Sequence, residues 1–391
     1  AFIPGHDASG KTAAFNPQPN NNRDFWETGI TNNTNVSFTQ SSGAGQSLRV
    51  SYTNQTIKGM LPNTKSVRHN LFSTFSMDLG NFFTVGANVT YTNQQINGEF
   101  GDGYANNSSG NFNQWFHRDL DMDKLKELSG LKTPIGTLAS WNFRRNPGSW
   151  SAAAPRNSVW GANYWYNMNS FYENINYAQK RDRIYGDVNL LFKLNNNFKI
   201  KGTVRTDQFN GNVENIIPNI LEYSGVQTGY LAGYGTSNTV NREWNFEGVA
   251  SYNKTFGDLG VSINAGANRL QIRNRAVAAN TNNGLSVPEL YAISNSKTTP
   301  SISNARTNSA ANSLFAFGDL EYRKFASITW AVRNDWFSTL PKGNNSLLSP
   351  SVGASFVFSE FTGKALPWLS FGKVYGSWGK KTKSLNPYAL N

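Results

Sequence analysis

Apolar and polar residues alternate along much of this chain with a period of two. Between positions 84 and 91 the apolar set is Val85, Ala87, Val89 and Tyr91, and the intervening set is Thr84, Gly86, Asn88 and Thr90. The same alternation returns at 48–53, 184–193, 261–268 and 351–358. A period of two places one set of side chains on each face of a β-strand. The pattern therefore predicts an all-β protein whose strands each have one apolar face.

Twelve strands are predicted in this way. They lie near residues 33–39, 47–54, 69–77, 83–93, 183–194, 198–209, 242–254, 261–270, 312–323, 327–336, 350–358 and 369–378. Most approach the roughly ten residues that a tilted strand needs to cross a bilayer. The strands are therefore long enough to form a transmembrane sheet.

The connections between these strands alternate in length. Short turns lie at 41–46, 78–82, 195–197, 255–260 and 324–326, whereas 55–68, 94–182, 210–241, 271–311 and 337–349 are longer. An antiparallel transmembrane β-barrel has short periplasmic turns at one end and long extracellular loops at the other. We therefore expect residues 1–391 to be part of one such barrel, with 1–32 as a lead-in segment and 94–182 as a long extracellular loop.

The apolar face of the predicted strands is expected to contact lipid, and the polar face to line the lumen. Aromatic side chains at the edges of the apolar face are then expected in interfacial girdles. These are Tyr52, Tyr91, Trp244, Tyr252, Tyr322 and Trp330. A β-sandwich is the alternative, and it would place the same rings in a core between two sheets.

Composition narrows the picture further. Aromatic residues make up 14% of the 391 residues, which is unlike a disordered chain. No apolar run approaches the roughly 18 residues of a transmembrane helix. The chain has no cysteine, which excludes disulfides and thiolate metal sites. Although the net charge is +12, Lys and Arg are dispersed, which argues against a nucleic-acid partner.

Residues 5–12 match the P-loop pattern for phosphate binding. Such a loop needs a strand before it and a helix after it, so that backbone N–H groups face the phosphate. Here four residues precede the motif, and Pro17 and Pro19 prevent a long helix after it. The match therefore predicts no nucleotide site, and no cofactor is expected.

Three acidic residues, Asp119, Asp121 and Asp123, resemble the start of a calcium-binding loop, but its turn glycine and closing glutamate are absent. A short helix over 122–128 with Asp121 as its N-terminal cap accounts for the same residues. The three histidines lack ligand spacing, and no GxSxG or HExxH motif occurs. We therefore expect neither a metal site nor an enzyme.

The 94–182 segment carries the candidate binding residues. It contains five of the eleven tryptophans, namely Trp115, Trp141, Trp150, Trp160 and Trp165. Exposed aromatic rings bind sugar rings or the side chains of a partner protein. The alternative is that these rings pack the loop against itself as a folded cap. The sequence alone leaves both interpretations open.

Several runs near the predicted strands resemble a known family. The most specific is AVRNDWFSTLP at 331–341, followed by PSVGASFVFSE at 350–360. Supporting runs lie at 49–52, 59–63, 121–125, 181–183, 251–256 and 370–373. Together they resemble the barrel signature of SusC/RagA-type TonB-linked outer-membrane transporters, over about residues 21–389.

The resemblance implies a barrel of about 22 strands that is closed by an N-terminal plug domain. This chain would hold about twelve of those strands, without the plug, the segment that contacts TonB, or the last strands. The protein would be a multi-pass protein of the outer membrane of a Gram-negative bacterium. Its function would be uptake of large solutes, oligosaccharides (glycans) or peptides. Its partners would be a SusD-like surface lipoprotein, TonB and outer-membrane lipids.

Other functions remain compatible with the residues alone. One is an outer-membrane adhesin or passive porin, which a plug domain and a TonB-binding segment would argue against. Another is an extracellular carbohydrate-binding β-sandwich, which would be soluble without detergent.

Overall fold

The fold is described from a computed structural model of the chain. The structure describes residues 7, 11, 14–43, 45–101, 103, 107–113, 116–134, 136–141, 165–222, 231–362 and 368–389. Within these residues no helix is long and apolar enough to cross a membrane.

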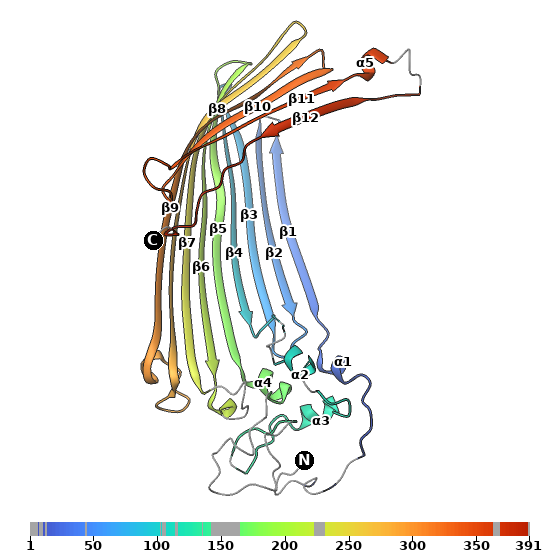
Figure 1. Cartoon of the computed structure of the whole chain (residues 1–391), viewed down its shortest axis with the longest axis vertical. Helices are drawn as coiled ribbons and strands as arrows, with labels where there is room; N and C mark the ends of the chain where they lie inside the picture. The colour runs from blue at the N-terminus through green and yellow to red at the C-terminus, as the bar shows by residue number, and fades with distance from the viewer. Residues whose placement is uncertain are drawn as a thin grey trace.

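A single antiparallel sheet of twelve strands forms most of the structure (Figure 1). The strands are β1 (Ile30–Ser42), β2 (Gln46–Lys58), β3 (Lys65–Leu79), β4 (Phe83–Asn97), β5 (Asn176–Lys193), β6 (Phe198–Ile217), β7 (Gly233–Phe256), β8 (Leu259–Leu285), β9 (Ser296–Tyr322), β10 (Ala326–Phe337), β11 (Ser346–Val357) and β12 (Lys373–Gly379). Each pairs with its neighbour in sequence, so β1 and β12 are the two edges of the sheet. All twelve predicted strands are confirmed.

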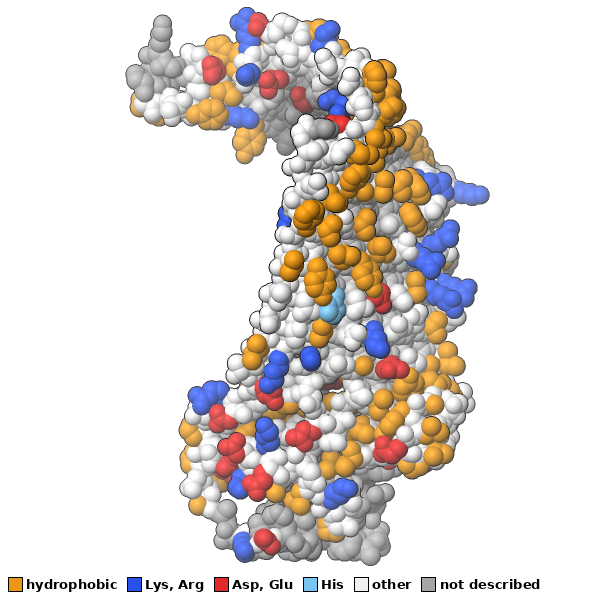
Figure 2. Space-filling model, turned by 180° about the vertical axis from the view of Figure 1, so that it is seen from behind, with side chains coloured by type: hydrophobic (Ala, Val, Ile, Leu, Met, Phe, Trp, Pro, Cys, Tyr) orange, Lys and Arg blue, Asp and Glu red, His pale blue; other side chains and the backbone are white. Residues whose placement is uncertain are grey.

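The pairing register brings the apolar residues of successive strands onto one face. One register row across β3 to β9 contains Met77, Val85, Leu190, Gly202, Gly248, Ala267 and Leu314. Figure 2 shows the result as an oblique band of hydrophobic side chains across this outer face. Many of its large residues are exposed; Val188, for example, is 55% exposed. Such a continuous exposed apolar face is stable only against lipid or another apolar surface.

The predicted girdle residues all occupy this outer face, as the register shows. Tyr52, Tyr91 and Trp244 lie near the middle of their strands, and Tyr252 and Tyr322 lie toward the short-turn end. The β-sandwich alternative does not fit, because the described strands form one sheet and its apolar face is uncovered. The fold is that of part of an outer-membrane β-barrel wall.

The long connections are shorter than predicted, because the strands continue into them. The connections of the structure are 59–64, 98–175, 218–232, 286–295 and 338–345, and β8 and β9 each reach 27 residues. At about 3.3 Å per residue these two strands extend well beyond a bilayer. Their outer halves are rich in Asn, Thr, Ser and Ala on both faces, so the alternation that predicts a strand is missing there.

One connection departs from the alternation of short and long. Residues 358–372 join β11 to β12 at the short-turn end and include a short helix, α5 (Ser359–Thr362). Phe361 of this helix packs edge-on against Phe325 at 4.8 Å and stacks with Phe356 at 5.6 Å. These ring contacts fix the helix to the turn between β9 and β10.

A charge on the outer face should destabilise the protein far more than a charge on the polar face. In the intact native protein, Val188→Arg should lower the free energy of unfolding by about 2–4 kcal/mol, since it places a guanidinium in the lipid-facing band. The matched control is Asn189→Arg, because Asn189 is the next residue in the strand and lies on the polar face. This substitution should change the free energy of unfolding by less than about 1 kcal/mol. Denaturant unfolding in lipid vesicles measures both. Equal losses would contradict the assignment of faces.

Candidate functional site

A folded cap lies at the long-connection end of the earlier strands of the sheet, away from the end of β8 and β9 (Figure 1). It consists of α1 (Asn21–Phe25), α2 (Ser109–Asn113), α3 (Met122–Glu127), α4 (Met168–Asn174) and the 3-10 turn η2 (Asn219–Leu221). Their common core contains Phe25, Leu61, Met122, Leu138, Tyr166, Met168, Phe171, Tyr172 and Leu221, all almost fully buried. The sequence predicted one short helix in 94–182, whereas the described part of that segment contains three.

Hydrogen bonds join the cap to the strand ends. The amide of Asn63, in the turn between β2 and β3, donates to the carbonyl oxygen of Tyr172 at 2.8 Å. Within the cap, the hydroxyl of Tyr166 donates to the carbonyl oxygen of Leu221 at 3.1 Å. Burial also raises the pKa of the Glu99 carboxyl, where β4 enters the cap. The cap is thus a fixed element rather than a loose loop.

The predicted helix in the cap is confirmed as α3. Asp121 is its N-terminal cap and accepts hydrogen bonds from the backbone N–H groups of Asp123 at 2.9 Å and Lys124 at 3.1 Å. These bonds use the Asp121 carboxylate for helix capping rather than for a calcium ion. No cluster of potential metal ligands occurs among the described residues.

Two of the five candidate tryptophans can be placed. Trp165 is 3% exposed and lies within the cap. Trp141 is half-buried; its indole N–H donates to the Asn111 side-chain oxygen at 2.7 Å, and its ring meets Phe116 edge-on at 5.8 Å. Trp115, Trp150 and Trp160 lie outside the described residues, as does most of the P-loop match at 5–12. Of the two placed rings, Trp141 alone is accessible to a partner.

A charged hollow of about 720 Å³ lies on the polar face, toward the cap. Its lining includes Arg68, Arg181, Arg183, Asp207 and Glu243. Register places Arg68, Gln94 and Arg181 side by side on β3, β4 and β5. Such neighbouring guanidinium groups are suited to binding carboxylate or phosphate.

The arginines of this hollow differ in how they are paired. Arg183 forms an ion pair with Asp207. Arg68 and Arg181 form no ion pair within the described residues, and their buried Nε atoms have no hydrogen-bond partner there. Two of the three guanidinium groups are therefore available to an anionic ligand. Sequence reasoning did not identify this hollow, because β4 and β5 are separated by the 98–175 connection and the register in which they pair cannot be read from the sequence.

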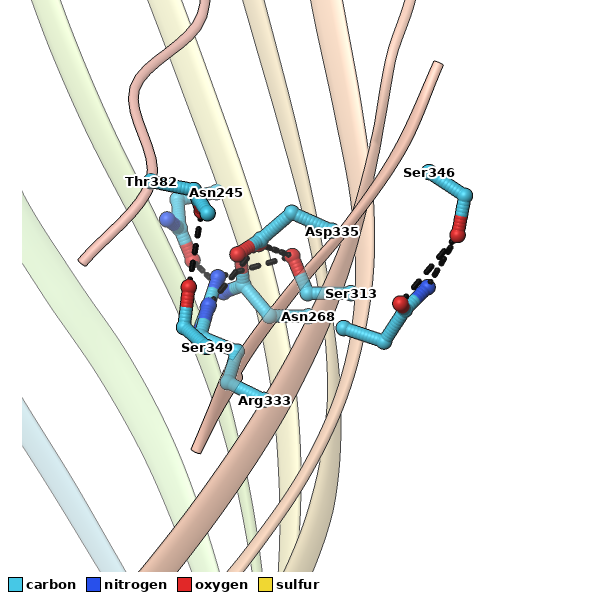
Figure 3. Close-up of polar contacts among 9 residues, drawn as sticks. Asn245, Asn268, Ser313, Arg333, Asp335, Ser346, Ser349 and Thr382 are labelled. Carbon is cyan, nitrogen blue, oxygen red and sulfur yellow. Dashed lines mark hydrogen bonds and ion pairs between the residues drawn. The ribbon is translucent and has the colours of Figure 1, made fainter. Parts of the chain in front are cut away.

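The run that most resembles the transporter family forms a polar network across strands. Figure 3 shows Arg333, Asp335 and Ser313 turned toward one another on the polar face. Arg333 donates to the Asp335 carboxylate at 2.8 Å and to the Ser313 hydroxyl at 2.7 Å, and Asp335 is only 8% exposed. Asn334 points to the opposite face, where it bonds to Ser346. The run thus alternates between the two faces and ties β9 to β10.

This network should contribute measurably to stability. We expect a coupling free energy of about 1–2 kcal/mol between Arg333 and Asp335, because the carboxylate is nearly buried and the guanidinium is not. The measurement is a double-mutant cycle of Arg333→Gln and Asp335→Asn, followed by denaturant unfolding. A coupling near zero would show that the two side chains do not depend on each other.

Solved structures resemble this fold over nearly the whole chain. No protein-family profile matches the sequence, and no curated protein matches it. A structure of the RagAB peptide transporter superposes with a TM-score of 0.70 at 18% identity, and covers 95% of this chain and 39% of that chain. The "open-open" state of the RagAB peptide importer superposes with a TM-score of 0.70 at 18% identity, and the match covers 97% of this chain and 40% of that chain. Its "closed-closed" state superposes with a TM-score of 0.67 at 17% identity, and the match covers 92% of this chain and 37% of that chain.

These similarities show the fold. The chain has the architecture of part of a RagAB transporter chain and spans about two fifths of its length. The predicted resemblance to SusC/RagA-type transporters and the predicted outer-membrane β-barrel fold are therefore confirmed at the level of the fold.

Proposed function

We propose that this chain forms part of the barrel of a TonB-dependent outer-membrane importer. The importer takes up peptides or glycans together with a SusD-like surface lipoprotein. The observation that carries the proposal is the fold, which the chain shares with the RagAB peptide transporter over 95% of its length. In that role the polar face lines the import path and the cap lies at the extracellular mouth.

The charged hollow supports binding of solutes with acidic groups. Arg68 and Arg181 provide guanidinium donors that form no ion pair among the described residues, although Asp207 and Glu243 line the same hollow. Tyr185 and Phe209 in the same hollow provide ring faces for apolar side chains or sugar rings. Carboxylates of acidic peptides, or of acidic sugars, fit both features. The structural relative RagAB is a peptide transporter, which favours peptides over glycans as the cargo.

Removing the two unpaired arginines should weaken uptake of acidic cargo. The double variant Arg68→Gln, Arg181→Gln should reduce the affinity of the full-length importer for acidic oligopeptides by about a hundredfold, since each of the two charge-assisted bonds contributes roughly 1.5 kcal/mol. Neutral oligopeptides should be affected less. Uptake of labelled peptides by whole cells, with and without TonB, measures both affinity and energy coupling.

The matched control removes two positive charges elsewhere. Arg323→Gln with Lys324→Gln changes the turn between β9 and β10, at the opposite end of the sheet, and should leave uptake unchanged. Equal loss in both double variants would contradict a specific role for the hollow. Uptake that continues without TonB would instead support a passive porin.

The cap supports a partner-binding role for Trp141. The half-buried ring packs against Phe116, and its indole N–H donates a hydrogen bond to Asn111. These two contacts hold the exposed part of the ring in position before a partner binds. Buried aromatic anchors of this kind dominate many protein interfaces. In this proposal the ring contacts the SusD-like lipoprotein at the barrel mouth.

Replacing this ring should weaken the complex with the lipoprotein. Trp141→Ala should reduce co-purification of the lipoprotein, with an expected loss of about 2 kcal/mol in binding free energy. Trp368→Ala is the control, because that exposed ring lies in the 358–372 connection at the far end of the sheet. Unchanged co-purification in Trp141→Ala would remove Trp141 from the interface, whereas the importer proposal would still stand on uptake.

A further inference from the structure

A group of arginines lies on the outer face, directly beside the apolar band. Its members, here called the outer arginine cluster, are Arg242 on β7, Arg269, Arg273 and Arg275 on β8, and Arg306 on β9. Arg242 is opposite Arg273 in the register, and Arg275 is opposite Arg306. All five are exposed, and none forms an ion pair within the described part of the chain. Figure 2 shows Lys and Arg side chains gathered at one side of the band.

The cluster begins where the apolar band ends. On β7 the band runs from Phe256 at the short-turn end to Trp244, and Arg242 follows on the same face. The alternating stretch from Trp244 to Phe256 spans about 40 Å along the strand, which a tilt of about 45° reduces to the thickness of a bilayer core. The cluster therefore lies at the level of the lipid headgroups of the outer leaflet.

Two hollows adjoin the cluster. One of about 350 Å³ is lined by Arg242, Trp244, Phe246, Gln271 and Arg273. The other, of about 880 Å³, lies in the apolar band and has Arg269 at its margin. Its lining includes Val204, Phe246, Gly248, Ala267 and Leu314. At Gly202 and Gly248, a Cβ atom would meet open space, so the hollow opens toward lipid.

Charge and shape together define the ligand. Five neighbouring guanidinium groups repel one another unless an anion lies between them. Guanidinium groups bind phosphate with paired hydrogen bonds, and the hollow beneath them accepts a hydrocarbon chain. A ligand with phosphates at the level of the arginines and acyl chains at the level of the apolar hollow matches both requirements. A soluble anion satisfies only the first.

We propose that the outer arginine cluster and the apolar hollow beside it bind a phosphorylated glycolipid of the outer leaflet. Its phosphates lie between Arg242, Arg273 and Arg275, and one of its acyl chains occupies the hollow beside Phe246. The inference rests on the outer-membrane barrel fold and is independent of what the protein imports. The site holds the barrel wall in the outer leaflet through a defined lipid contact.

The test is lipid retention by the full-length protein. The triple variant Arg242→Gln, Arg273→Gln, Arg275→Gln is purified in detergent and titrated with bisphosphorylated lipid A, with bound lipid counted by native mass spectrometry. Each arginine near an anionic membrane surface contributes roughly a fivefold change in affinity, so the variant should bind on the order of a hundredfold more weakly. Dephosphorylated lipid A should bind the unchanged protein as weakly as lipid A binds the variant.

The control variant removes the same charge from the other face. Arg49→Gln, Lys199→Gln, Lys201→Gln removes three positive charges from the polar face, outside the charged hollow, and should retain lipid A fully. Gly248→Leu, which fills the apolar hollow, should weaken binding without any change in charge. Equal lipid binding by the outer-face variant and the unchanged protein would overturn the proposal. Equal binding of phosphorylated and dephosphorylated lipid A would overturn it as well, whatever the uptake experiments show.

Discussion

Strand pairing in a single register is the constraint on which the rest of the structure depends. A slip of one residue between β4 and β5 would turn Val188 and Leu190 to the polar face and expose Asp187 and Asn189 to lipid. The register is held by the apolar band on one side and by cross-strand polar contacts on the other, such as Arg205 with Glu247 at 2.9 Å. In a bilayer, where unpaired backbone groups have no water partner, this pairing also satisfies the backbone.

The two faces give the arginines different roles. On the polar face, Arg333 is paired and stabilises the sheet, whereas Arg68 and Arg181 line the charged hollow without an ion pair among the described residues. On the outer face, the cluster around Arg273 begins where the apolar residues stop. The face of the strand and the distance from the apolar band therefore separate the arginine that stabilises the sheet from those that we propose to bind cargo and lipid.

The strands could be predicted from the sequence because their central parts combine one lipid-facing and one polar face. The outer half of β8 could not be predicted in this way. Asn274, Ala276 and Ala278 lie on one face there, and the residues between them, on the other face, are as a set neither more apolar nor more polar. The hollow around Arg181 depends on a pairing across the 98–175 connection, and no local pattern encodes it. The burial of Trp165 was equally hidden, since composition does not distinguish a binding ring from one that packs a cap.

In this fold one face of the sheet contacts lipid and the other faces an aqueous lumen. Because this chain has no cysteine, single cysteines at Val188 and Asn189 in the intact protein test it directly. Each is labelled with a fluorophore in native membranes and exposed in turn to a lipid-phase quencher and to a water-soluble one. We expect lipid-phase quenching at 188 and aqueous quenching at 189. Aqueous quenching at both positions would contradict it.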